Sequence, residues 1–183
     1  VHYVDAPVSG GTKGAEEASL AIMAGGAAEE FATVTAALSA MGRPVHVGPV
    51  GAGQLAKLAN QAIVGITIAA VAEAMLMLQN GGADPAAVRA ALKGGFADST
   101  ILQLHGARMT TGDFTPGGLC TLQLKDLNNA VSEAESFGLI LPTLINTRDR
   151  FQRLVTELDG AELDHSALYV ELRDQNGLDD VLR

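Results

Sequence analysis

The amino-acid sequence predicts a mainly α-helical fold, in which an all-α helical bundle follows the last strands of a truncated α/β domain. Short β-rich runs are confined to residues 1–50, whereas residues 51–183 carry apolar side chains at helical spacing almost throughout. Of the 183 residues 48% are hydrophobic, yet only 4% are aromatic and none is Trp. A core built from Ala, Leu, Ile, Val and Met favours close packing of helices.

The first part of the chain contains three strand candidates and one helix. The strands are predicted at residues 1–8, 20–26 and 43–50, and the helix at 27–42, where it ends at a glycine. Three short strands make a poor sheet on their own. We therefore expect residues 1–50 to be the end of a larger α/β domain whose beginning is missing, and the lack of an initiator Met agrees with this.

The second part opens with a long helix predicted over residues 52–79. Asp84 is expected to cap the next helix, with Pro85 at its first position. Further helices are predicted at 99–110, 119–138 and 142–160, and a short one with a polar tail at 164–183. The apolar run within the long helix is interrupted by polar residues and falls short of the about 20 apolar residues of a membrane span, which indicates a buried helix.

The charge and cysteine content restrict the class of protein. The formal net charge is −9 and no Lys/Arg cluster is present, which argues against a nucleic-acid partner. The single cysteine, Cys120, forms no disulfide within the chain and is expected in the core. Together with the lack of a signal peptide, this predicts a cytoplasmic protein. The four histidines show no metal-ligand spacing, so no metal site is predicted.

A lysine lies just inside the predicted long helix, in the segment GPVGAGQLAKLANQAIVG. Lys57 falls in the second turn, and Asn60 and Gln61 follow at positions i+3 and i+4 on the same face. A lysine pKa falls readily on burial, and a neighbouring amide orients an oxygen without adding charge. This arrangement suits general acid/base chemistry on a carbonyl or alcohol. An exposed helical lysine is the alternative.

Two further clusters carry polar groups suited to binding. Ser9, Gly10 and Gly11 follow a predicted strand and are able to cradle a carboxylate or phosphate, although a plain glycine turn fits the same pattern. Lys125 and Asp126 lie on a predicted helix, where they contact a cofactor or form a solvated face.

The segment DHSAL at residues 164–168 places three residue types of a catalytic triad side by side. Triad members meet through the fold and not as sequence neighbours. We therefore interpret Asp164 as a helix N-cap.

Four segments, in this order and spacing, closely resemble the β-hydroxyacid dehydrogenase family: residues 5–26, 48–65, 125–127 and 164–168. The resemblance covers residues 1–172. It implies that residues 1–50 are the C-terminal remnant of a Rossmann NAD(P)-binding domain. Residues 51–183 are then an all-α substrate and dimerisation domain that begins with a long interdomain helix, and the active site lies in the cleft between the two domains.

The resemblance also implies roles for the residues singled out above. Lys57, with Asn60 beside it, acts as general acid when a short semialdehyde such as tartronate semialdehyde is reduced by NAD(P)H, and as general base in the reverse reaction. The substrate carboxylate is held by four residues: Ser9, Gly10, Gly11 and Gln61. Lys125 lies near the nicotinamide end of the cofactor, with Asp126 beside it.

The chain departs from the family pattern at two places. No strand–GxGxxG–helix unit occurs in it, so the cofactor is expected to be bound mainly by a missing part and this chain alone to be inactive. Gly118 and Leu119 stand where an aromatic and a basic residue are expected, which leaves the substrate open, with 3-hydroxyisobutyrate as the alternative. A non-catalytic helical dimerisation or metabolite-binding module is the other hypothesis. A homo-oligomer, dimer or tetramer, is expected in either case.

Overall fold

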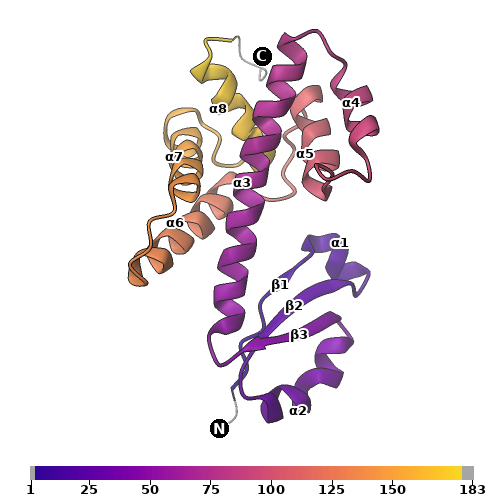
Figure 1. The fold of residues 1–183 in the computed structure, drawn as a ribbon, viewed down its shortest axis with the longest axis vertical. Helices are drawn as coiled ribbons and strands as arrows, with labels where there is room; N and C mark the ends of the chain where they lie inside the picture. The colour runs from indigo at the N-terminus through magenta and orange to yellow at the C-terminus, as the bar shows by residue number, and fades with distance from the viewer. Residues whose placement is uncertain (1–2, 179–183) are drawn as a thin grey trace. The chain divides into compact units, whose positions relative to one another are not determined.

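The computed structural model describes residues 3–178, which form two compact units, the first ending at Asn60 and the second beginning at Gln61. The predicted start of the first strand and the end of the polar tail lie outside the described residues. The elements, shown in Figure 1, are β1 (Val8–Ser9), α1 (Gly11–Glu16), β2 (Leu20–Gly25), α2 (Ala28–Ser39), β3 (Gly42–Gly48), α3 (Ala52–Asn80), α4 (Pro85–Leu92), α5 (Thr100–Thr111), α6 (Cys120–Ser136), α7 (Pro142–Glu157), the short 3₁₀ helix η1 (His165–Ala167) and α8 (Leu168–Gln175).

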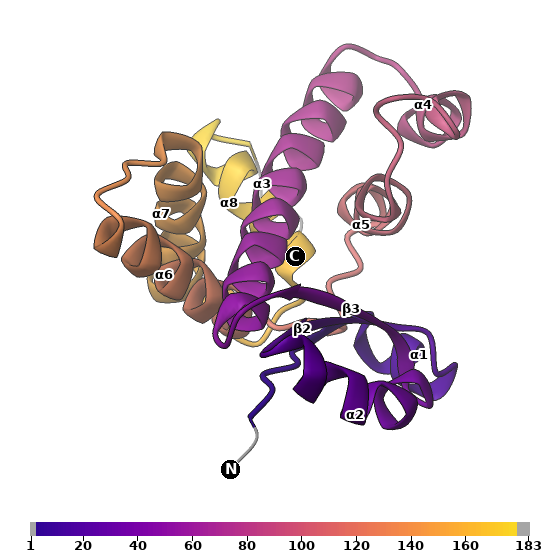
Figure 2. The same ribbon diagram turned by 60° about the horizontal axis from the view of Figure 1, so that its bottom comes forward.

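The first unit is a small α/β structure. Its sheet has the order β1-β2-β3, with β1 antiparallel to β2 and β2 parallel to β3. The helix α2 joins the two parallel strands and packs against them (Figure 2). Leu20, Ile22 and Ala24 of β2 are buried at every second position, as expected for a central strand. The prediction of an α/β segment before the helical part is confirmed.

One local prediction in this unit is wrong, and one short helix was not predicted. A strand was expected over residues 1–8, but β1 begins only at Val8, and Asp5 makes a single antiparallel bridge to Gly25. Pro7 lacks the N–H group that a longer ladder needs. The short helix α1 over residues 11–16 was not predicted. The turn is limited to Gly10 and Gly11, whose φ angles of 141° and 61° favour glycine.

A buried carboxylate holds the start of α3 against the end of β2. Asp5 is 5% exposed and accepts hydrogen bonds from the backbone N–H groups of Gly51 (2.7 Å) and Gln54 (2.8 Å). A negative charge at a helix N-terminus satisfies orphan donors and interacts favourably with the helix dipole. A Cβ at Gly25 or Gly53 would lie 2.5 or 2.6 Å from the Asp5 carboxylate oxygens, so this close approach requires glycine at both positions.

The second unit is a helical bundle whose core is mainly aliphatic, with Phe114, Phe151 and Tyr169 as its large aromatic members among the described residues. In both views α6, α7 and α8 lie on one side of α3, and α4 and α5 on the other (Figures 1 and 2). The fully buried side chains of α3 are Ile68, Ala72 and Met75, each 0% exposed. These residues recur at helical spacing, which confirms the periodicity on which the prediction of a helical domain depends.

The predicted helix boundaries in this unit agree with the structure within a few residues. The side chain of Asp84 accepts a hydrogen bond from the Ala86 N–H (2.9 Å), as predicted for an N-cap, and Pro85 is the first residue of α4. Ser99 caps α5 in the same way, and Gly112 ends that helix in the left-handed conformation. The helix predicted to reach residue 160 ends at Glu157.

Among the described residues, α3 is the one helix long and apolar enough to cross a membrane by length and composition. The core helix of a soluble protein satisfies the same criteria. The complete burial of Ile68, Ala72 and Met75 inside the bundle fits that second role.

Candidate functional site

Lys57 contacts the strand that leads into the predicted carboxylate cradle. Its ammonium group donates a hydrogen bond to the backbone carbonyl of Val8 at 2.9 Å, and the side chain is half-buried. Val8 immediately precedes Ser9 in β1, so the lysine and the first residue of the predicted cradle come together inside the first unit. The carbonyl orients the ammonium group towards the strand that carries Ser9.

The backbone at the predicted cradle has a conformation that only glycine adopts without strain. Gly10 has a φ of 141°, and a Cβ there would lie 3.1 Å from the Leu20 side chain. Gly11 has a φ of 61°, and a Cβ there would meet no atom within 4 Å. Backbone conformation therefore favours glycine at both positions, and packing against Leu20 restricts position 10 further.

The predicted residues of the second unit form a separate hydrogen-bonded group. The side-chain amide of Gln61 donates to an Asp126 carboxylate oxygen at 2.8 Å. The other oxygen of Asp126 lies 3.3 Å from the Lys125 ammonium group, which is on an exposed side chain. A residue of α3 is thus tied to the acidic residue of the KDL segment on α6.

The predicted site residues therefore fall into two groups. Lys57 lies with Val8 and Ser9 in the first unit, and Gln61 lies with Lys125 and Asp126 in the second. Asn60 directly precedes Gln61, and both are on α3 with Lys57, at the i+3 and i+4 positions that the sequence predicts.

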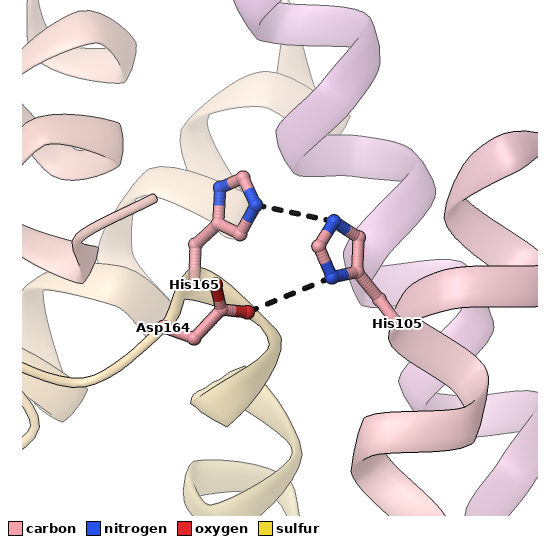
Figure 3. Close-up of side chains that lie close together, drawn as sticks. All are labelled: His105, Asp164 and His165. Carbon is pink, nitrogen blue, oxygen red and sulfur yellow. Dashed lines mark hydrogen bonds and ion pairs between the residues drawn. The ribbon is translucent and has the colours of Figure 1, made fainter. Parts of the chain in front are cut away.

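The structure also brings together polar residues whose proximity the sequence does not reveal. His105 of α5 and His165 of η1 face each other with their Nε2 atoms 3.2 Å apart (Figure 3). Their rings are perpendicular, with centroids 4.6 Å apart. On its other side, His105 Nδ1 lies 3.5 Å from a carboxylate oxygen of Asp164. The two histidines are 60 residues apart, so spacing gives no signal for this contact.

Asp164 organises the loop before α6 as well as the start of η1. Its side chain accepts hydrogen bonds from the backbone N–H groups of Gly117 (2.9 Å), Gly118 (3.1 Å) and Ser166 (3.0 Å) and from the Ser166 hydroxyl (2.6 Å). Arg108 lies 3.1 Å from the same carboxylate. Burial opposes ionisation, but the hydrogen bonds from Ser166 and Gly117 hold the pKa of Asp164 below its usual value. The predicted N-cap is confirmed.

Imidazole and carboxylate groups are common metal ligands, and those of His105, His165 and Asp164 lie within 4.8 Å of one another. Both oxygens of Asp164 are already occupied by the donors described above, and the carboxylate faces Nδ1 of His105, away from the two Nε2 atoms. Two imidazoles alone fall short of the three or four protein ligands of zinc sites. The arrangement therefore fits a hydrogen-bonded network better than a metal centre.

Packing accounts for the glycine at position 118. A Cβ there would lie 3.2 Å from Cε1 of His165, so the imidazole ring occupies the space that a larger side chain would need. The thiol of Cys120 next to it donates to the Asp164 carbonyl at 3.3 Å. Burial raises the pKa of Cys120 to about 12 and makes it an inert core group, as the sequence predicts.

A short α/β unit that leads through one long helix into a helical bundle is also present in solved dehydrogenase structures. A 3-hydroxyisobutyrate dehydrogenase from Salmonella typhimurium shares the fold with a TM-score of 0.83 and 25% identity over 92% of this chain. The Mycobacterium tuberculosis 3-hydroxyisobutyrate dehydrogenase, solved with L-serine, has a TM-score of 0.83 and 30% identity over 93% of it. The chain covers 59% and 60% of those two proteins.

The sequence comparisons assign the family. The family described as the NAD-binding domain of NADP-dependent 3-hydroxyisobutyrate dehydrogenase matches residues 51–172, and the NAD-binding domain of 6-phosphogluconate dehydrogenase matches residues 1–51. The chain belongs to the 3-hydroxyisobutyrate dehydrogenase family, which confirms the predicted resemblance. It is 46% identical over 167 residues to the 2-hydroxy-3-oxopropionate reductase of Escherichia coli K12, covering 91% of this chain and 57% of that enzyme.

Proposed function

We propose that this chain is the C-terminal portion of a cytoplasmic NAD(P)-dependent β-hydroxyacid dehydrogenase. It reduces a short semialdehyde such as tartronate semialdehyde to its hydroxy acid, or catalyses the reverse reaction. The observation that carries the proposal is the 2.9 Å hydrogen bond from Lys57 to the Val8 carbonyl, because it holds a proton donor beside Ser9. The 46% identity to a 2-hydroxy-3-oxopropionate reductase supports the substrate class.

In the proposed enzyme, the two parts of the chain have different roles. Residues 1–50 are the end of a Rossmann NAD(P)-binding domain, and residues 51–183 are the all-α substrate and dimerisation domain. The boundary between the two family matches at residue 51 supports this division. The chain spans 57–60% of the length of these relatives, and the proposal assigns most of the cofactor contacts to the part of the protein outside residues 1–183.

The residues present fit one edge of a nicotinamide cofactor, because Lys125 offers an exposed ammonium group on the helix of the KDL segment. When bound, the reduced cofactor supplies the hydride. Lys57 then donates its proton to the carbonyl oxygen of the semialdehyde, so the carbonyl becomes an alcohol and the lysine is left as a neutral amine. Solvent then reprotonates the lysine. In the oxidation direction the neutral amine accepts the proton of the substrate hydroxyl. Asn60, one turn further along α3, orients the reacting oxygen.

The substrate carboxylate binds at Ser9, Gly10 and Gly11, with Gln61 as a further donor. The glycine conformations support this role because they leave the backbone at position 11 uncovered by side chains. The relative solved with L-serine binds a small molecule that carries a carboxylate, which supports the substrate class. 3-Hydroxyisobutyrate remains the alternative substrate, because Gly118 and Leu119 depart from the family pattern.

The proposed enzyme assembles into a homo-oligomer through its helical domain. Several large apolar side chains of the second unit are exposed, among them Ile63 (65%), Met77 (70%) and Ile140 (80%). Exposed apolar side chains of this size favour burial against another protein surface.

Substitution of Lys57 in the complete protein tests the proposed reaction. Reduction of tartronate semialdehyde by NADH or NADPH is expected to slow by about 10²–10⁴-fold in Lys57→Ala, the usual contribution of a positioned acid. Lys93→Ala, at an exposed position at the end of α4, is the matched control and should keep the wild-type rate. Wild-type protein that neither reduces this semialdehyde nor oxidises 3-hydroxyisobutyrate would favour a non-catalytic dimerisation or metabolite-binding module.

A further inference from the structure

We propose that Gln123 and His165 are positioning residues of this reaction, forming a buried hydrogen-bonded chain that holds the turn of α3 carrying Gln61. The inference rests on the function proposed above, in which Gln61 binds the substrate. Neither residue touches the reacting atoms in this scheme, and both act through Gln61.

Gln123 is the central member of the chain. It is 2% exposed, and its side-chain amide nitrogen donates to the backbone carbonyl of Gln61 at 3.1 Å. Its amide oxygen lies 3.4 Å from Nδ1 of His165. A Cβ at Gly65 would lie only 3.0 Å from the Gln123 nitrogen, so glycine at position 65 permits this approach of α6 to α3. A buried amide contacted at both ends is a strong constraint, because an unmade bond there leaves a desolvated polar group.

Gln61 is thereby held by α6 at two points. Gln123 binds its backbone carbonyl, and Asp126 binds its side-chain amide at 2.8 Å. Both partners flank Lys125, the residue proposed to contact the cofactor. The register of α6 against this turn of α3 therefore sets the substrate-binding and cofactor-binding groups of the second unit relative to each other.

The contact between Gln123 and His165 couples the orientation of the amide to the tautomer of the ring. The Gln123 nitrogen donates to a carbonyl, so its oxygen faces His165 and requires an N–H group at Nδ1 of that ring. At the far end, Nδ1 of His105 lies 3.5 Å from Asp164 and makes no hydrogen bond within the described residues, and one proton lies between the two Nε2 atoms. The two hydrogen bonds of the histidine pair therefore use two ring protons, the number that two neutral imidazoles hold.

The surroundings keep this pair neutral near pH 7. Burial is the main cause that lowers the pKa of both histidines, and the positive charge of Arg108 beside Asp164 acts in the same direction. Neutral rings supply both of these protons and leave Nδ1 of His105 without one, in agreement with its lack of a hydrogen bond to Asp164 at 3.5 Å. The orientation of Gln123 consequently depends on the tautomer of His165, which makes His165 part of the positioning chain.

The experiment compares Gln123→Leu with wild type in the complete protein. Loss of the amide is expected to raise the KM for tartronate semialdehyde about tenfold, the cost of about one lost hydrogen bond, with the KM for NAD(P)H unchanged. Gln152→Leu, the same change at an exposed site on α7, is the matched control and should leave both KM values unchanged. In a Gln61→Ala background, Gln123→Leu should raise the KM no further, because the chain acts through Gln61.

Hydrogen exchange of the backbone at residues 61–65 gives a readout independent of activity. Exchange there should be faster in Gln123→Leu and in His165→Leu than in wild type. A Gln123→Leu protein with a lowered Tm but an unchanged KM for the semialdehyde would overturn the proposal, since that result marks a purely structural residue. Lack of semialdehyde reduction by wild type would overturn the proposed function and this role with it, whereas the exchange data would still report whether the contact exists.

Discussion

At the residue scale, the chemistry of this chain depends on how single polar groups are partnered. The ammonium group of Lys57 is oriented by the neutral Val8 carbonyl, whereas the Lys125 ammonium group lies against the Asp126 carboxylate. The contact of Lys57 holds an ammonium group beside Ser9, as a proton donor for the proposed reaction requires, and that of Lys125 ties an exposed ammonium group to its neighbour on α6.

His105 makes stability depend on pH. Burial, followed by the neighbouring charge of His165, lowers the pKa of His105 to about 4 from 6.5, with Arg108 acting in the same direction and Asp164 opposing. Between these two values the unfolded chain binds the proton and the folded chain does not, so this contribution to stability is complete above pH 6.5 and is lost as the pH falls to about 4.

Urea unfolding of wild type and His105→Gln, at about pH 7 and about pH 4.5, measures this contribution. Wild type should lose more stability than the variant over this interval. Because carboxylates titrate in both proteins, the difference between the two losses is the relevant quantity. An equal loss in both would show that His105 is charged in the folded protein.

At the element scale, a single carboxylate determines where α3 begins. Asp5→Ala would leave the part-buried N–H groups of Gly51 and Gln54 without this acceptor, at a cost of about 1–3 kcal/mol in the free energy of unfolding. Asp84→Ala removes the exposed cap of α4 and should cost about 1 kcal/mol or less. Chemical denaturation of both variants measures the two losses in the free energy of unfolding and shows which is larger. A smaller loss for Asp5→Ala than for Asp84→Ala would contradict the role of Asp5 at the start of α3.

Helix boundaries were predictable because their signals are local. Asp84 with Pro85, Ser99 and Gly112 are all cap residues that act within one turn of their own position. The short helix α1 was missed because it has only six residues and two of them, Gly11 and Gly14, are glycines, which lower helix propensity. The first strand was predicted to be longer than β1, because a β-rich composition does not show that the Asp5 side chain binds the N-terminus of α3.

The candidate site was predictable only in part, for a related reason. Lys57, Asn60 and Gln61 share one helix, so their grouping follows from helical spacing. The contact of Lys57 with Val8 joins residues 49 apart, and that between His105 and His165 joins residues 60 apart. Contacts of this kind are created by tertiary packing, and no periodicity in the sequence encodes them.

At the scale of the whole molecule, the exposed apolar side chains predict self-association. Light scattering of the complete protein is expected to give the mass of a dimer or tetramer. Ile140→Glu and Met77→Glu, at positions 80% and 70% exposed, should shift it towards the monomer without loss of helical circular dichroism. A wild-type monomer at micromolar concentration would contradict this assembly.

Delivery of the proton by Lys57 during reduction is tested most directly by chemical rescue. Stopped-flow fluorescence of NAD(P)H would follow the reduction of tartronate semialdehyde by the complete Lys57→Ala protein, with and without added small primary amines. We predict a slow reaction that accelerates with amine concentration, because an ammonium ion replaces the missing acid. A Lys57→Ala protein that transfers hydride at the wild-type rate without amine would contradict this role of Lys57.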